Sequence, residues 1–256
     1  MPGTNLIINA DDFGINAETT HAIMAAMDSG LCLDTTLLVN FENSEHAAKL
    51  AISNKRKDHV GIHLNLTEGK PLSTRIQNER LFCNEEGLFH YKKQKRILKL
   101  SIAEKKAVCE EITSQIRLCR SFGIPISHAD SHNHIHEEPG LFLLLINILK
   151  KEKIPFLRLT NNLEKVALPN RIYRNSCNYI LNTKKISGTN YFGSTSDFRN
   201  STTKFQSDAI VELMIHPGQE SDNQIYDVYS NENLSQVLPE IIKGNRLISY
   251  NQLSKY

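Results

Sequence analysis

The feature that most constrains the fold is a regular alternation of short apolar segments with helix-patterned segments in the N-terminal part of the chain. The predicted strands are 6–8, 34–40 and 59–66, and the predicted helices between them are 17–28 and 43–53. The first strand is wholly apolar, the second is rich in β-branched residues, and the third alternates apolar with polar side chains. Strands that alternate with helices in this way are typical of a parallel α/β fold.

Segments of the same two kinds continue toward the C-terminus. Helices are predicted at 101–121, 141–150 and 233–242, and strands at 154–159 and 210–215. Ser101 with Glu104 three residues later is the capping-box pattern of a helix start. Two long segments, 69–98 and 182–206, are predicted to be mainly loop, either shaping a substrate pocket or forming solvated excursions. Because no linker or internal repeat interrupts the chain, a single domain over residues 1–256 is predicted.

Composition excludes several classes of protein. The formal net charge of +2 is too small to favour a nucleic acid or a membrane surface as a partner. Five cysteines without CxxC spacing favour free thiols in a reducing compartment, so a cytoplasmic location is expected. The N-terminal residues lack a signal-peptide pattern, and the longest apolar run, 141–146, is far too short to span a membrane.

A row of histidines is the most unusual local feature. Histidine or aspartate occupies every second position over nine residues, at His128, Asp130, His132, His134 and His136. On an extended backbone these side chains point to one face, so a strand that runs into a row of imidazoles is predicted. Nine extended residues cover roughly 26 Å, so one ion reaches only one or two of them. The others orient ligands or bind substrate, and the alternative is a solvated, histidine-rich loop.

Paired carboxylates, Asp11 and Asp12, directly follow the first predicted strand. Buried carboxylates are costly unless they hold a metal ion or share a proton, so we expect one to be a ligand and the other a free base. The alternative is that one of them caps the helix that follows.

Histidines and an arginine end other predicted strands. His63 together with Asp12 and His132 supplies the two-imidazole, one-carboxylate set of metallohydrolases. Arg158 and His216 also lie at strand ends, and a core histidine is the alternative for His216. Residues at the carboxyl ends of parallel strands converge on one mouth of a barrel. The convergence of these residues on one site is therefore the main functional prediction.

Four motifs carry a family resemblance: residues 9–14 (NADDFG), 61–67 (GIHLNLT), 128–136 (HADSHNHIH) and 215–218 (IHPG). Together the chain resembles the YdjC-like carbohydrate deacetylases, which include the chitooligosaccharide deacetylases. The resemblance implies an α/β, distorted TIM-like (β/α) barrel of mostly parallel strands. It also implies a divalent metal ion, with magnesium as the first choice and zinc, manganese or cobalt as alternatives. The implied reaction is hydrolysis of an N-acetyl group on a small acetylated sugar.

The resemblance also assigns roles to residues. Asp12, His63 and His132 would hold the metal, and Asp11 would be the base. Arg158 would orient that base, and His216 would be the acid.

Two other functions stay open at this point. A metal-dependent amidohydrolase or phosphoesterase is one, because His134 and His136 form an HxH pair. A non-catalytic sugar- or metal-binding protein is the other, although it would need neither a base nor an acid. The natural sugar and the oligomeric state, a homodimer included, are also open.

Overall fold

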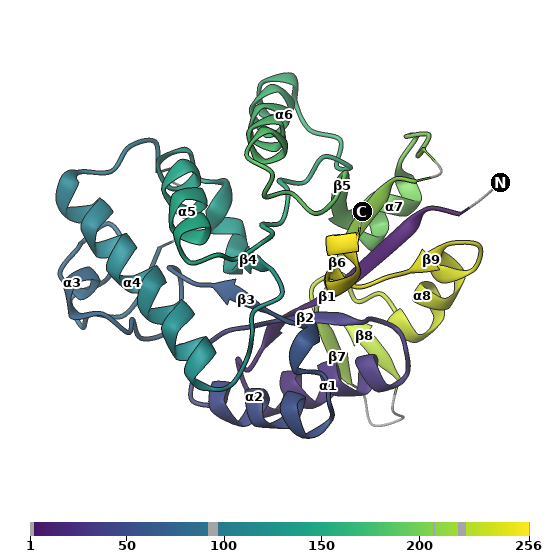
Figure 1. Cartoon of the computed structure of the whole chain (residues 1–256), viewed down its shortest axis with the longest axis horizontal. Helices are drawn as coiled ribbons and strands as arrows, with labels where there is room; N and C mark the ends of the chain where they lie inside the picture. The colour runs from purple at the N-terminus through teal and green to yellow at the C-terminus, as the bar shows by residue number, and fades with distance from the viewer. Residues whose placement is uncertain (1–2, 92–96, 207, 220–223, 256) are drawn as a thin grey trace.

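A parallel sheet forms the centre of the computed structural model, which describes residues 3–91, 97–206, 208–219 and 224–255 (Figure 1). The strands are β1 (Asn5–Phe13), β2 (Asp34–Leu37), β3 (Val60–Leu64), β4 (Ala129–Ser131), β5 (Tyr191–Ser194), β6 (Ile210–Ile215), β7 (Pro217–Gln219), β8 (Ile225–Asp227) and β9 (Arg246–Leu247). The order in the main sheet is β4-β3-β2-β1-β6-β5, all pairs are parallel, and β9 pairs with the start of β1. Strands β7 and β8 form a separate antiparallel hairpin. The predicted parallel α/β fold is confirmed.

The sheet curves into a distorted, incompletely closed barrel, and helices surround it (Figure 1). They are α1 (Ala17–Asp28), α2 (Ser44–Ser53), α3 (Thr74–Gln77), α4 (Ile102–Ser121), α5 (Pro139–Lys151), α6 (Leu168–Thr183), α7 (Thr195–Asn200) and α8 (Leu234–Ile242), with 3-10 turns η1 (Lys57–His59), η2 (His132–Glu137) and η3 (Tyr250–Lys255). The five predicted helices are confirmed to within two residues at each end. At the start of α4 the capping box is complete, because Glu104 N donates to Ser101 Oγ (3.1 Å) and Ser101 N donates to Glu104 Oε2 (2.6 Å).

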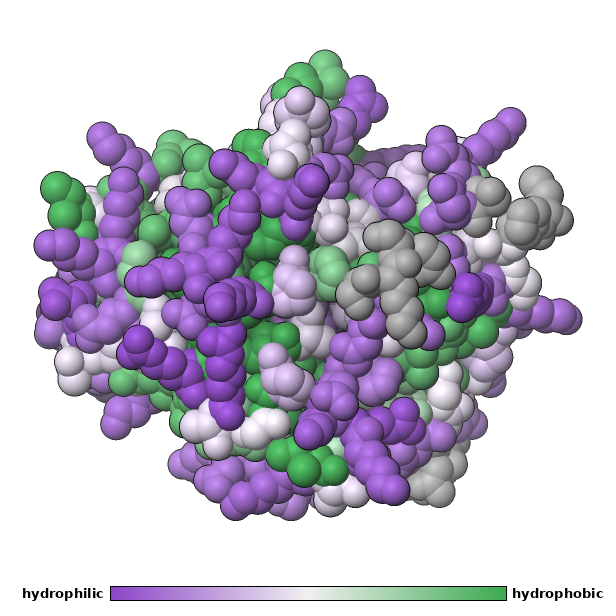
Figure 2. Space-filling model, viewed as in Figure 1, coloured by the Kyte–Doolittle hydropathy of each residue, from purple (hydrophilic) through white to green (hydrophobic). Residues whose placement is uncertain are grey.

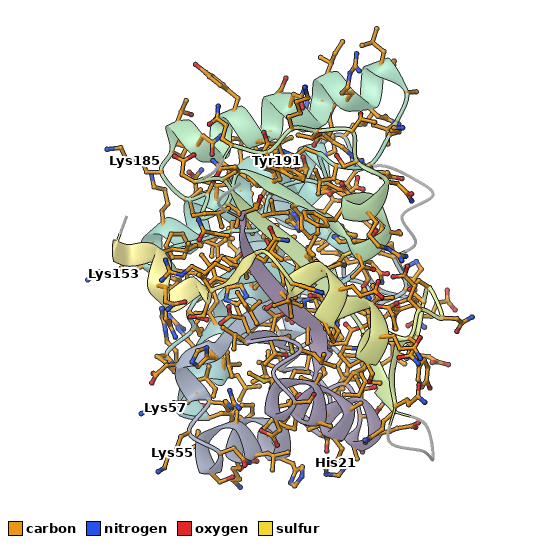
Figure 3. The ribbon with its side chains drawn as sticks, turned by 90° about the vertical axis from the view of Figure 1, so that its right-hand side faces the viewer. His21, Lys55, Lys57, Lys153, Lys185 and Tyr191 are labelled. Atoms are coloured by element: carbon orange, nitrogen blue, oxygen red, sulfur yellow. The ribbon has the colours of Figure 1, made fainter. Side chains whose placement is uncertain are left out.

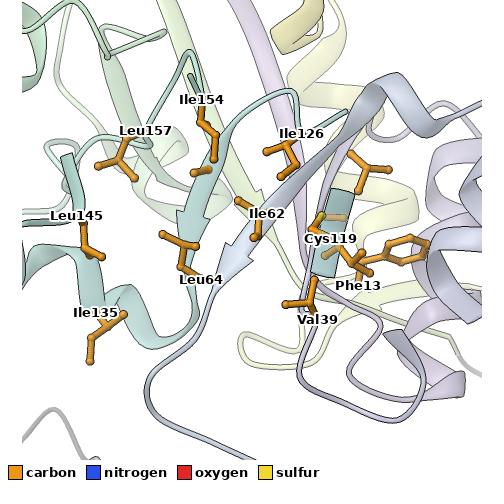
Figure 4. Packing of buried hydrophobic residues seen from close by; sticks show 14 of the residues in the cluster. Phe13, Val39, Ile62, Leu64, Cys119, Ile126, Ile135, Leu145, Ile154 and Leu157 are labelled. Atoms are coloured by element: carbon orange, nitrogen blue, oxygen red, sulfur yellow. The ribbon is translucent and has the colours of Figure 1, made fainter. Parts of the chain in front are cut away.

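Apolar side chains from strands and helices fill the space between the layers. Ile62 and Leu64 of β3 are fully buried, and they lie among side chains of α5 and of the segment before Arg158 (Figure 4). Gly61, which precedes Ile62 in β3, lies on the other face of the strand, where a Cβ atom would stand 2.7 Å from the His128 ring. A side chain at this position would therefore push His128 out of the core.

Two sequence predictions in the second half of the chain are wrong in extent. The strand expected at 154–159 is reduced to one bridge, between Leu157 and Ala129. The segment 182–206, expected to be loop, contains β5 and α7 as well as the end of α6. Helix α6 was not foreseen because most of it is exposed: Leu168 and Ile172 are 57% and 58% accessible, and apolar side chains are visible over α6 at the top of Figure 2.

The described part of the segment 69–98 is mainly loop, as predicted, apart from the short helix α3. Its basic cluster, 92–96, lies outside the described residues. The buried Glu111 of α4 holds the first part of this segment, accepting hydrogen bonds from Leu72 N (3.1 Å) and Ser73 N (2.7 Å).

The two ends of the barrel differ in their side chains. Lys57, Lys153 and Lys185 precede strands or strand-like segments, and they project along one side of the molecule in Figure 3. The carboxyl ends of β1, β3, β4 and β6 instead carry the acidic and imidazole groups described below. Among the described residues, no helix combines the length and apolar character needed to cross a membrane.

Candidate active site

A cavity of about 230 Å³ opens at the carboxyl ends of the central strands. Its lining consists of Asp11, Asp12, His63, Ser131, His132, Asn133, His134, Met214, His216 and Tyr229. Five of the six predicted site residues therefore line one cavity. The sixth, Arg158, is completely buried directly behind Asp11.

A bulge in β1 explains how two adjacent aspartates face the same cavity. Ala10 pairs with Thr35 of β2 and Phe13 pairs with Leu37, so Asp11 and Asp12 together stand opposite a single residue. Asp12 has a φ of 70°, a left-handed conformation that aspartate tolerates better than most residues. The alternative of a helix-capping aspartate is wrong, because Asn16 is the N-cap of α1.

The Asp12 carboxylate joins two imidazoles. Its Oδ1 lies 2.8 Å from His132 Nδ1 and 3.2 Å from His63 Nε2. Burial alone would raise the pKa of Asp12, but hydrogen bonds from His132 and His63 outweigh it and hold the pKa well below its usual range. Burial opposes a charged His63, yet the charge of Asp130 and the hydrogen bond to Asp12 raise its pKa to about 10. The cluster thus attracts a positive charge, carried by a proton on His63 where no metal is bound.

These three residues fit a divalent metal ion. They offer one carboxylate oxygen and two imidazole nitrogens that all lie within 4.8 Å of one another, and all three side chains are buried. The imidazole nitrogens that face Asp12 Oδ1 are His132 Nδ1 and His63 Nε2. Metal–ligand bonds of about 2.0–2.2 Å place neighbouring ligand atoms roughly 3 Å apart, which matches the separations around Asp12 Oδ1. A metal ion would take the place of the His63 proton, so its binding releases a proton.

Asp130 supports this cluster from behind. It is the direct partner of His63 in the β3–β4 register, and its Oδ1 lies 2.7 Å from His63 Nδ1. Its other oxygen accepts a hydrogen bond from Thr36 Oγ1 (3.0 Å) and lies 2.9 Å from Arg158 Nη1. A carboxylate on the far nitrogen of a histidine fixes the tautomer that leaves the near nitrogen free for a metal.

Asp11 is held by a bidentate arginine. Arg158 Nη1 donates to Asp11 Oδ2 (2.6 Å) and Nη2 donates to Oδ1 (2.7 Å). Asn9 Nδ2 adds a third hydrogen bond to Oδ1 (2.8 Å). Asp11 Oδ2 also lies 4.0 Å from His216 Nε2, so it faces the cavity with acceptor capacity to spare.

His216 also lines the cavity and stands between Asp11 and Asp227. Its Nδ1 lies 3.6 Å from Asp227 Oδ2, and its backbone N donates to the same oxygen (2.7 Å). Burial alone would lower the pKa of His216, but the hydrogen bond to Asp227 and the charge of Asp11 raise it above its usual value. The exposed ring of Tyr229 packs edge-on against His216 at 4.5 Å.

The histidine row does not form one extended face, so that prediction is wrong beyond Ser131. Strand β4 ends there, and Asn133 and His134 adopt left-handed conformations (φ 53° and 52°) in η2. His134 lines the cavity, whereas His136 is fully buried with Nδ1 2.5 Å from Ser131 Oγ. His128 is fully buried and does not line the cavity, and its Nε2 lies 3.0 Å from Asn9 Oδ1. The HxH pair is therefore split between the cavity and the core.

Some of these contributors carry no recognisable signal in the sequence. Asp227 and Tyr229 come from the β7–β8 hairpin and the turn after it, and no motif marks them. Asp130 lay in the histidine row, but its partner became evident only with the β3–β4 register.

Fold and site together define a parallel α/β barrel with an Asp-His-His cluster, a buried Asp–Arg pair and a His–Asp pair at the strand ends. The family profile described as YdjC-like protein matches residues 5–251, and the chain therefore belongs to the YdjC-like family.

Curated relatives are similar over part of their length. A carbohydrate deacetylase of Clostridium beijerinckii is 35% identical over 150 residues, which cover 59% of this chain and 58% of the relative. A carbohydrate deacetylase of Geobacillus stearothermophilus is 35% identical over 153 residues, covering 58% of this chain and 57% of the relative. The match thus spans less than two thirds of these relatives.

A solved structure shares the fold over nearly the whole chain. It is a protein of Enterococcus faecalis V583 proposed to be a cellobiose-phosphate cleavage protein. The TM-score is 0.71 at 21% identity, and the alignment covers 98% of this chain and 99% of the other.

Proposed function

We propose that this chain is a metal-dependent hydrolase that removes N-acetyl groups from acetylated amino sugars of the chitooligosaccharide type or a related glycan. The observation that carries the proposal is the placement of three functional units around one cavity: an Asp-His-His cluster, an arginine-held carboxylate and a carboxylate-held histidine. Hydrolysis of an amide needs an electrophile, a base and an acid, and each unit suits one of these tasks. The relatives named carbohydrate deacetylases support the choice of substrate class.

In this proposal Asp12, His63 and His132 hold the divalent ion. When bound, the ion supplies Lewis-acid activation of the amide carbonyl and of the attacking water. Family resemblance favours magnesium, but two imidazole ligands suit zinc, manganese or cobalt better than magnesium, which prefers oxygen ligands. Asp130 keeps the His63 proton on Nδ1 and leaves Nε2 directed at the site.

Asp11 and His216 are the base and the acid of the proposal. Asp11 Oδ2 faces the cavity and accepts a proton from the attacking water, while Arg158 fixes the plane of the carboxylate. His216 Nε2 donates a proton to the leaving amine, and Asp227 favours the protonated ring that this step requires. Because the two groups face each other across 4.0 Å, one acetamido group can lie within reach of both.

The cavity mouth suits a sugar. The Tyr229 ring is 69% exposed at the lining, and an exposed aromatic face packs well against a pyranose ring. Glu68 adds a carboxylate 3.4 Å from His132 Nε2, where it can accept sugar hydroxyl hydrogens. We further propose that residues 1–256 work as one domain in the cytoplasm, which suits the five free cysteines.

A screen for acetate release tests the proposal. Chelated protein is assayed on N-acetylglucosamine oligomers and other acetylated amino sugars, with magnesium, manganese, zinc or cobalt added back. We expect acetate release only with an added metal. A chain that binds metal but releases no acetate from any of these sugars would contradict the proposed reaction.

A further inference from the structure

Arg158 makes a contact that the proposed reaction does not use. Its Nη atoms hold Asp11, but its Nε donates to Glu212 Oε1 at 2.7 Å on the opposite side of the guanidinium. Both Arg158 and Glu212 are completely buried, and the Phe192 ring lies 4.8 Å below the guanidinium carbon. A guanidinium anchored at Nε cannot turn about its last side-chain bond, so its two Nη donors keep their direction.

Glu212 is itself held by a residue from the C-terminal segment. Its second oxygen, Oε2, accepts a hydrogen bond from Tyr250 Oη at 2.7 Å. Burial raises the pKa of Glu212 to about 7, although Arg158 and the Tyr250 hydroxyl both favour the charged form. The carboxylate therefore depends on these two partners, and the loss of either leaves an underpaired charge in the core.

Tyr250 has little freedom of its own. Its ring stacks on His128 at 3.8 Å with an interplanar angle of 11°, and its backbone N donates to the buried Asp34 Oδ2 (2.9 Å). Tyr250 and the neighbouring Ile248 and Leu253 form a small hydrophobic cluster with Ile7 of β1, separate from the main core. The chain's last described segment is thus fixed under the barrel, on the side opposite the cavity.

A second route leads from the same tyrosine to the same carboxylate. His128, stacked on Tyr250, lies with Nε2 3.0 Å from Asn9 Oδ1, and Asn9 Nδ2 donates to Asp11 Oδ1 (2.8 Å). Burial lowers the pKa of His128 to about 3, so the ring is neutral and its Nε2–H donates to Asn9. Both routes from Tyr250, through Glu212 and Arg158 or through His128 and Asn9, end on Asp11.

We propose that Tyr250 and Glu212 are positioning residues that fix the Arg158 guanidinium, and through it the Asp11 carboxylate, in the orientation needed for catalysis. The C-terminal segment thereby sets the geometry of the base from the far end of the barrel. The inference rests on the proposed function for its kinetic consequence, but the contact itself can be tested without any turnover.

The test compares Tyr250→Phe, which removes only the hydroxyl, with Glu212→Gln, which keeps the size of the side chain. With the manganese-loaded protein and an N-acetylglucosamine oligomer, we expect each variant to lower kcat about tenfold and to leave KM within about twofold. The double variant should lose little more than the worse single variant, because both residues act through Arg158. Tyr179→Phe, an exposed tyrosine on α6, is the matched control and should not change kcat.

A readout independent of activity is the NMR signal of the Arg158 Nε–H group, assigned by its absence in Arg158→Lys. We expect it to shift and to exchange faster with solvent in Tyr250→Phe and in Glu212→Gln, and to stay unchanged in Tyr179→Phe. Manganese affinity should stay close to that of the wild type, because Asp12, His63 and His132 are not touched.

Three results would overturn the inference: an unchanged kcat in Tyr250→Phe, fully additive losses in the double variant, or a kcat loss matched by an equal loss of bound manganese. If the wild type releases no acetate, the proposed function fails, and the Nε–H signal alone decides this inference. A shift in Tyr250→Phe would then support the positioning contact, and an unshifted signal would refute it.

Discussion

Asp130→Asn is the substitution that most sharply tests how the metal site is built. Asp130 touches no cavity, yet it accepts hydrogen bonds on one oxygen from His63 Nδ1 (2.7 Å) and on the other from Thr36 Oγ1 (3.0 Å). Arg158 Nη1 lies 2.9 Å from that second oxygen. An asparagine has the same shape but only one acceptor oxygen. In either orientation its amide N–H groups meet a donor, and either His63 or the Thr36–Arg158 side loses its partner.

The expected effect on metal binding follows from this geometry. Loss of the group that orients a ligating histidine costs about 10- to 100-fold in metal affinity, or about 1.4–2.8 kcal/mol. Because the site is buried, we also expect the free energy of unfolding to fall by roughly 1–3 kcal/mol. The two effects are separated by calorimetric titration of chelated protein with manganese or zinc, at a temperature where circular dichroism shows the variant folded.

Asp28→Asn is the matched control, because this exposed aspartate at the C-terminal end of α1 lies 3.5 Å from Arg56 and does not line the cavity. It should change neither metal affinity nor stability measurably. A metal affinity of Asp130→Asn within about twofold of the wild type would refute the proposed support of His63.

Three further predictions concern the histidines around the cavity. His216→Ala should keep its metal but slow deacetylation on the order of a hundredfold, and the loss should shrink on an activated acetyl ester, whose leaving group needs less protonation. Asp227→Asn should lower the raised pKa of His216, so the alkaline limb of the kcat–pH profile should move to lower pH, because the protonated acid is lost earlier as pH rises. His132→Ala should weaken metal binding by more than about a hundredfold, whereas His134→Ala should leave most of the metal in place.

Each of these has a clear contrary result. If His216→Ala slows the reaction equally on the acetylated sugar and on the activated ester, His216 is not the acid. If the alkaline limb of the kcat–pH profile does not move in Asp227→Asn, the group that titrates there is not His216. If metal is lost in His134→Ala but kept in His132→Ala, the HxH pair of His134 and His136 would be the ligands instead.

The first strands, and the gathering of polar residues at strand ends, could be predicted because their signals are local. Apolar runs that end in Asp11–Asp12, His63 and His216 indicate both a buried strand and the place where polar groups gather. The bulge that turns both aspartates toward the cavity could not be predicted, because it depends on the pairing of β1 with β2.

Contacts between segments distant in the sequence could not be predicted either, because they too depend on how the chain folds in space. Glu212, 54 residues after Arg158, reads in the sequence as one polar residue in an apolar strand. Tyr250 reads as an ordinary residue near the end of the chain. Helix α6 was missed because its sequence is mostly polar and it buries only Cys177, Asn178 and Leu181.

The extended histidine row failed for a different reason. Alternation predicts a strand only while the backbone stays extended, and here the chain turns after Ser131. Two successive left-handed residues, Asn133 and His134, bring His134 back to the cavity and carry the chain on toward α5. Such strained conformations gather at functional sites and leave no simple pattern in the sequence.

The central claim is that Asp12 holds a catalytic metal while its neighbour Asp11 acts as the base. The most direct measurement is the metal content and the rate of acetate release of Asp11→Asn and Asp12→Asn, purified in parallel and loaded with the same metal. The account predicts that Asp12→Asn loses metal and activity together, whereas Asp11→Asn keeps close to one metal ion per chain and loses at least about a hundredfold in kcat. Equal metal loss in both variants, or an active Asp11→Asn, would contradict it.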